Sequence, residues 1–180
     1  MTRNSKTLEK APIIFTSNAP IRLNYTDMID QLQLKEELFK KCKEYTEARI
    51  NAIQSAMDSV FQSKILESKS SAGDKFETGR TMMQNEETKL NGQMHKAKSD
   101  QEVLFTTANR SATDQIGPGN LVKTSQGTYL IAIGIGKVRI DDLVYYCISA
   151  ESPIGAELLD KAVGDKFVFN ERDFLIQEIH

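Results

Sequence analysis

The stretch from Met28 to Ser68 contains neither proline nor glycine, and this constrains the chain more than any other feature. Apolar residues recur there at three- and four-residue steps, with Lys and Glu between them, which predicts one long amphipathic helix. The apolar stripe consists of Leu32, Leu38, Phe39, Cys42, Tyr45, Ile50, Ile53, Met57, Val60, Phe61 and Ile65. Such a stripe needs a second element to pack against.

A second helical pattern follows after a short polar turn. Its apolar positions fall at seven-residue intervals, with Met94 at a partner position, which is typical of a helix with one apolar seam. The seam consists of Phe76, Met83, Leu90, Ala97 and Leu104. Two long helices joined by a tight turn form an antiparallel hairpin. We therefore expect a coiled-coil hairpin over residues 28–107, with its tip at 69–79 and a reach on the order of 45 Å.

The predicted tip carries two carboxylates, Asp74 and Glu77, three residues apart. Ser, Gly and Asp favour any helix–helix turn, and acids stabilise a helix N-terminus through capping and the helix dipole. The pair therefore has two interpretations, as helix caps or as functional acids displayed at the end of a thin rod. From residue chemistry alone, both interpretations remain open.

Residues 1–27 show no periodicity and mix Lys and Arg with Asn and Ser, so we expect a mobile N-terminal tail. Met28 opens the helical pattern so cleanly that a translation start at Met28 is a hypothesis. The net charge of −2 argues against a nonspecific nucleic-acid coat. No apolar run is long enough to span a membrane, and the cysteines Cys42 and Cys147 form no CxxC pair. We expect a cytoplasmic protein with no membrane partner.

Beyond a linker at 108–118, which contains Thr, Asn, Ser, Asp and Gly and shows no periodicity, the pattern changes from helical to extended. One helix of about two turns is expected at Gly155–Lys161. The predicted strands are Leu121–Thr124, Thr128–Ile135, Val138–Ile140, Leu143–Ile148, Lys166–Phe169 and Phe174–Ile179. Residues 119–180 therefore predict a small antiparallel sheet with one short helix on one face, which makes the whole chain α+β.

The sequence offers no complete catalytic set of its own. The only histidines are His95 and His180, so no Ser, His and Asp arrangement is available for nucleophilic catalysis. No cluster matches the ligand spacing of a zinc site. Asp74 and Glu77 are therefore the remaining candidates for chemistry, and we do not expect a free-standing enzyme.

At this point the residues resemble a known family. The turn Gly73-Asp74-x-x-Glu77 between two antiparallel helices resembles the coiled-coil tip of the bacterial Gre transcript-cleavage factors. The segment from Ile148 to Asp165 resembles the C-terminal domain of that family, in which a Ser-Pro turn leads into a short helix and then a Val-Gly-Asp turn. The match covers roughly Leu38 to Ile179, in the same order.

This resemblance implies an FKBP-like C-terminal domain that binds bacterial RNA polymerase, contacting it through Glu151, Ser152 and Pro153. The hairpin would enter the secondary channel of the polymerase. There Asp74 and Glu77 would help to hold a second Mg²⁺ in the polymerase active site, so that the polymerase cuts backtracked RNA near its 3′ end. The resemblance implies no cofactor bound to the factor alone, and we expect a monomer.

The chain departs from the family directly after Glu77, where it reads Thr78-Gly79-Arg80-Thr81 and the family continues Asn-Ala-Glu-Tyr. Lys75 and Arg80 place positive charge beside the acids, where it could contact RNA phosphate or neutralise the carboxylates. Three functions therefore stay open: a cleavage factor, a secondary-channel regulator that does not cleave, and a coiled-coil adaptor unrelated to polymerase.

Overall fold

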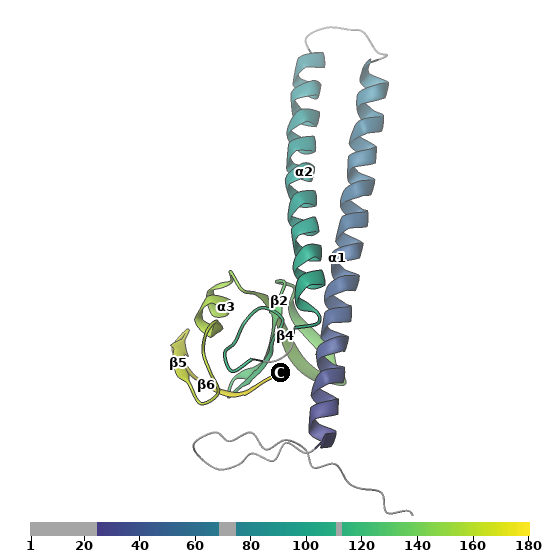
Figure 1. Cartoon of the computed structure of the whole chain (residues 1–180). Coiled ribbons are helices and arrows are strands. Elements are labelled where there is room, and N and C mark those ends of the chain that lie inside the picture. The colour runs from purple at the N-terminus through teal and green to yellow at the C-terminus, as the bar shows by residue number, and fades with distance from the viewer. Residues whose placement is uncertain (1–24, 69–74, 111–112) are drawn as a thin grey trace, which may run out of the picture.

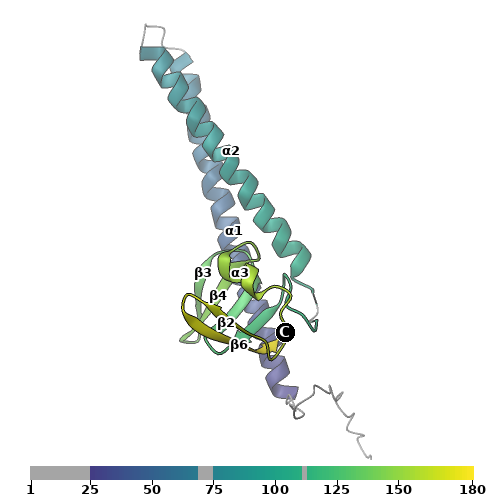
Figure 2. The ribbon, with the colours of Figure 1, turned by 90° about the vertical axis from the view of Figure 1, so that its left-hand side faces the viewer.

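A computed structural model describes residues 25–68, 75–110 and 113–180, with side chains over 30–66, 78–110 and 113–180. Two long helices, α1 (Tyr25–Ser68) and α2 (Lys75–Thr107), lie side by side and extend well beyond a sheet domain (Figures 1 and 2). The other elements are β1 (Leu121–Thr124), β2 (Gly127–Ala132), β3 (Gly136–Ile140), β4 (Leu143–Ser149), α3 (Pro153–Leu158), β5 (Lys166–Phe169) and β6 (Arg172–Ile179). The α+β class predicted from the sequence is confirmed.

The ion pairs between the long helices show that they are antiparallel. Residues later in α1 pair with residues earlier in α2. Arg49 pairs with Asp100 at 3.4 Å, and further out Lys64 pairs with Glu87. α1 runs unbroken from Tyr25, three residues before the predicted start. The predicted tail residues 1–24 and the tip residues 69–74 lie outside the described part of the chain.

The predicted seam between the helices is confirmed over most of its length. Leu90, Ala97 and Leu104 are buried on α2. The stripe of α1 is narrower than predicted, because Leu32, Tyr45 and Phe61 are exposed while Leu38, Phe39, Cys42 and Ile53 are buried. The physical reason is that the apolar face of α1 is wider than the surface that α2 and the sheet together cover.

The sheet is mixed, so the predicted antiparallel arrangement is wrong at one strand pair. The strand order is β3-β4-β2-β1-β6-β5, and β2 runs parallel to β4 with Leu130 opposite Cys147. The cause is the β3–β4 hairpin, which turns at Asp141 and Asp142, both with positive φ, and which leaves β4 beside β2 in the same direction. Turn signals predict the hairpin itself but do not predict which earlier strand its second arm will join.

The two faces of the sheet pack against different helices. Residues alternate between the faces, as a pleated strand requires: Leu121 and Leu130 point to the hairpin, while their neighbours Val122 and Ile131 point to α3. The hairpin contributes Leu38, Phe39, Cys42 and Leu104 to the first core, and α3 contributes Leu158 to the second. The inner part of the hairpin is thus built into the sheet domain.

Polar contacts hold this junction together. Lys35 of α1 is buried, and its Nζ donates to the carbonyl oxygens of Arg110 at 3.0 Å and His180 at 3.4 Å. Burial lowers the pKa of Lys35. After α2 the chain turns at Gly119, where φ is +94° and an added Cβ would lie 2.6 Å from the carbonyl oxygen of Thr107. Only glycine fits this turn without strain.

Candidate functional site

The first turn of α2 lies at the end of the hairpin farthest from the sheet. α2 begins there at Lys75, and Figure 1 shows this end well away from the strands. Asp74 lies outside the described residues, and Lys75 and Glu77 belong to the first turn of α2 without described side chains. Arg80, in the second turn, is exposed. At about 1.5 Å per residue, the 33 residues of α2 span roughly 50 Å.

The predicted partner-binding turn lies on the sheet domain, away from the start of α2. Glu151 and Pro153 are exposed, and Ser152 between them is half-buried. Ser152 is the N-cap of α3: its Oγ donates to the carbonyl oxygen of Ser149 at 2.7 Å and accepts from the amide of Gly155 at 3.1 Å. Pro at the first helical position suits this cap because it has no amide to satisfy.

Close packing at Gly155 makes this turn rigid. An added Cβ would lie 2.1 Å from the carbonyl oxygen of Ser149 and 2.8 Å from Ser152 Oγ. The helix predicted at Gly155–Lys161 starts two residues earlier, at Pro153, and ends at Leu158. The cap and the closely packed glycine together define the backbone of the turn that carries Glu151.

A groove of about 380 Å³ lies between α2 and the segment that leads into this turn. Its charged lining consists of Lys96, Asp100, Arg110 and Glu151. Asp100 is paired with Lys96 at 3.1 Å and with Arg49 at 3.4 Å, whereas the Arg110 guanidinium donates to the carbonyl oxygen of Pro118 at 3.4 Å. The groove therefore places charges of both signs beside Glu151.

Sequence reasoning did not predict that Lys96 and Arg110 line one groove with Glu151. On the sequence they belong to a charged helix face and to a linker, and nothing in the pattern relates them to a turn so far along the chain. Their proximity follows from the turn at Gly119, which brings the sheet back against the end of α2.

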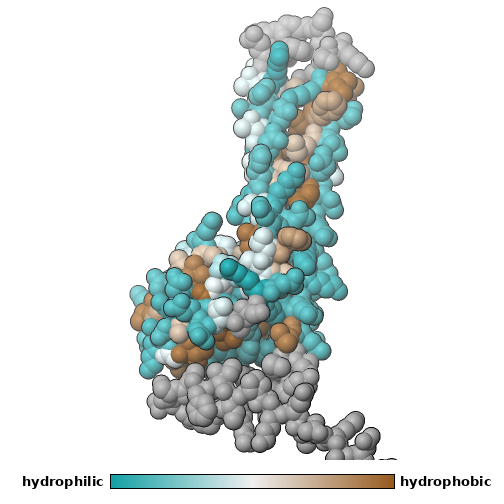
Figure 3. Space-filling view, in the orientation of Figure 1, coloured by the Kyte–Doolittle hydropathy of each residue, from teal (hydrophilic) through white to brown (hydrophobic). Residues whose placement is uncertain are grey.

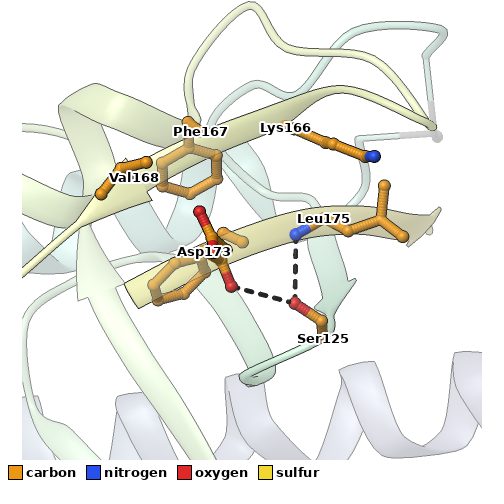
Figure 4. A pocket seen from close by; sticks show the side chains of 7 residues that line it. Ser125, Lys166, Phe167, Val168, Asp173 and Leu175 are labelled. Carbon is orange, nitrogen blue, oxygen red and sulfur yellow. Dashed lines mark hydrogen bonds between the residues drawn. The ribbon is translucent and has the colours of Figure 1, made fainter. Parts of the chain in front are cut away.

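A second hollow, of about 460 Å³, lies on β5, β6 and the turn after β1 (Figure 4). Ser125 Oγ donates to the carbonyl oxygen of Asp173 at 3.4 Å and accepts from the amide of Leu175 at 3.1 Å. None of the residues predicted to act at a site lines this hollow. It is a feature of the sheet edge, separate from both predicted sites.

The described residues contain no group of three or more His, Cys, Asp or Glu side chains arranged to hold a metal ion. Within the same residues, no helix combines the length and the apolar character needed to cross a membrane. The start of α2 and the turn before α3 thus lie well apart, the first at the far end of the hairpin and the second on the sheet domain.

Comparison of this chain with known protein families, with curated proteins and with solved structures finds no match. The protein is therefore described by its architecture: an α+β chain in which a long helical hairpin precedes a six-stranded mixed sheet. The resemblance to the Gre family rests on the tip residues and on the segment around Ser152 and Pro153.

Proposed function

We propose that this protein is an elongation factor of bacterial RNA polymerase that inserts its hairpin into the secondary channel and stimulates cleavage of backtracked RNA. The observation that carries the proposal is the separation of the two motifs along the molecule. The end of α2 that bears Glu77 projects far beyond the sheet, while Glu151 and Pro153 are exposed on the sheet domain.

This separation suits a factor that docks at one place and acts at another. A two-helix rod is about as slender as a folded chain can be, and the roughly 50 Å of α2 is enough to reach from a surface into a deep channel. In the proposal, the domain built on the mixed sheet is the FKBP-like part and remains on the polymerase surface, and its rigid turn at Ser152 contacts the polymerase.

The donor chemistry of the tip suits a shared metal ion. Carboxylate oxygens are ligands that Mg²⁺ prefers, but two carboxylates supply only part of an octahedral shell. Asp74 and Glu77 would therefore add ligands and negative charge to a metal that the polymerase already holds in part. When bound, that Mg²⁺ activates the attacking water and stabilises the charge that develops on the cleaved phosphate. Lys75 and Arg80 would contact the RNA backbone.

The groove beside Glu151 supports a docking role for the sheet domain. Lys96, Arg110 and Glu151 all line it, so it fits a polypeptide surface with charges of both signs better than it fits a uniformly charged ligand. In the proposal, Glu151 and this groove set the affinity for polymerase, while the tip acids set the cleavage rate.

The test uses a stalled, backtracked elongation complex of bacterial RNA polymerase with radiolabelled RNA. Wild-type protein should shorten the transcript. The variant with Asp74→Asn and Glu77→Gln should bind equally but cleave on the order of a hundredfold more slowly, because a metal ion contributes several kcal/mol to the transition state. Glu47→Gln, an exposed carboxylate on the shaft, is the matched control and should behave as wild type.

Each other outcome has a defined meaning. Binding without any shortening by wild type would replace the proposal with a regulator that occupies the channel without cleaving, a role that Lys75 and Arg80 beside the acids would suit. Absence of binding would favour an adaptor whose hairpin contacts another helical protein. Glu151→Lys should weaken binding without changing cleavage in complexes saturated with the factor.

A further inference from the structure

Two cysteines that are far apart in the sequence meet where the hairpin packs on the sheet. Cys42 of α1 and Cys147 of β4 are both free, and both are fully buried. They belong to one core cluster, which also holds Leu38, Leu104 and Leu130. The sequence gives no sign of this pairing, because neither cysteine has another one nearby in the chain.

Regular structure holds each cysteine in place on its own side of the junction. Cys147 lies in the interior of the sheet, opposite Leu130 of β2 on one side and Gly136 of β3 on the other. Cys42 lies within the continuous helix α1, where its carbonyl oxygen accepts from Thr46 Oγ1 at 2.9 Å. The pair therefore bridges the hairpin and the centre of the sheet.

The environment keeps these thiols unreactive while the junction is closed. A hydrogen bond with Cys42, burial and the proximity of the Cys42 charge all raise the pKa of Cys147. The thiolate is the nucleophile in disulfide exchange, so a protonated thiol without solvent access does not react. Reaction requires a local opening that separates the hairpin from the sheet.

We propose that Cys42 and Cys147 form a latent cross-link that closes under oxidising conditions and fixes the hairpin to the sheet domain. During an opening, one thiolate attacks a low-molecular-weight disulfide, forms a mixed disulfide and releases one small thiolate. Before the junction closes again, the second cysteine, also exposed as a thiolate, attacks the cysteine sulfur of the mixed disulfide and displaces the other small thiolate, so that the Cys42–Cys147 bond forms. The two cysteines lose two electrons and two protons, and the small disulfide becomes two thiols.

The expected consequence is a conformational lock. The new bond would close a loop that contains the outer hairpin, the connection after α2 and the first four strands. A loop of this size restricts the unfolded chain strongly, so the thermal midpoint should rise by about 10 °C in the oxidised form. This inference is independent of polymerase binding.

The test incubates the reduced full-length protein with oxidised glutathione and follows the intact mass and the peptide map. Wild type should lose two hydrogens, yield a peptide in which Cys42 is joined to Cys147, and show the higher thermal midpoint. Cys42→Ala and Cys147→Ala are matched controls, and each should stop at a glutathione adduct without the increase.

Two results would overturn the proposal. The wild type could accumulate stable glutathione adducts, as the single variants do. Alternatively, the folded wild type could keep both thiols reduced under conditions that oxidise the urea-unfolded chain. If an alanine variant fails to fold, the wild-type peptide map and reversal of the midpoint shift by reductant still decide the question.

Discussion

The inner and outer parts of the hairpin have the same secondary structure but different support. Near the sheet, the helices bury Leu38 and Leu104 almost completely in a core shared with the strands. Toward the tip, only helix–helix contacts remain, and Phe61, Leu66 and Met82 are 60%, 68% and 68% exposed. Figure 3 shows apolar surface along this outer part. The inner part is anchored in a domain, whereas the outer part is a free rod.

This difference teaches that the seam pattern alone does not measure stability. Both parts carry apolar residues at helical spacing, and between the helices alone Ile53 and Leu90 are still buried. Farther out, Met57 and Val60 are only partly buried, so less apolar surface leaves water there. The predictions below test the contrast by making similar changes in the two parts, in order of expected effect.

The largest contrast is between two leucine truncations. Leu104→Ala should lower the free energy of unfolding by about 3 kcal/mol, because Leu104 is 1% exposed and its removal leaves a cavity where α2 meets the sheet. Leu66→Ala, in the outer part of α1, should change it by less than about 0.5 kcal/mol. Urea unfolding of both variants gives the comparison. Equal losses would mean that the outer rod is as well packed as the junction.

Two glycine substitutions should differ in sign. Gly119→Ala should destabilise the protein by about 2 kcal/mol, because its φ is +94° and the new Cβ would meet the carbonyl oxygen of Thr107. Gly92→Ala, in α2 with nothing within 4 Å of the new Cβ, should stabilise it by about 0.5–1 kcal/mol through helix propensity. Thermal unfolding measures both, and a stabilising Gly119→Ala would contradict the account of the turn.

The smallest contrast concerns charge. Asp100→Asn should cost about 1 kcal/mol, because the Asp100 side chain is 14% exposed and pairs with both Arg49 and Lys96. Glu86→Gln removes an exposed pair with Lys89 within one helix and should have almost no effect. Urea midpoints at low and high salt separate the two. A salt-independent loss for Asp100→Asn would point to packing rather than charge.

Local patterns in the sequence were enough for most elements. The seven-residue spacing of Leu90, Ala97 and Leu104 predicts the seam, and the alternation of the strands predicts their positions closely. These features depend on neighbours in the chain. The candidate acids at the tip also come from local spacing, and they stay a prediction because neither Asp74 nor the side chain of Glu77 lies within the described residues.

Features that depend on distant segments were not predictable. The parallel pairing of β2 with β4 depends on which strand of the β3–β4 hairpin packs beside β2. Lys35 lies among charged residues in the sequence but is buried, because two carbonyl oxygens from other parts of the chain accept its hydrogen bonds. The pairing of Cys42 with Cys147 is hidden for the same reason. Proximity across the fold, rather than composition, creates each of these.

The contact between Lys35 and the carbonyl oxygen of His180, just after β6, has a consequence for synthesis on the ribosome. α1 emerges long before β6, so Leu38 and Phe39 have no strands to cover them while the chain is still growing. α1 can pair with α2 first, but this pairing leaves the apolar residues at the sheet end of the hairpin accessible to chaperones or to aggregation. Translation thus completes the helical hairpin early, and the strand that completes the sheet covering its inner end comes last.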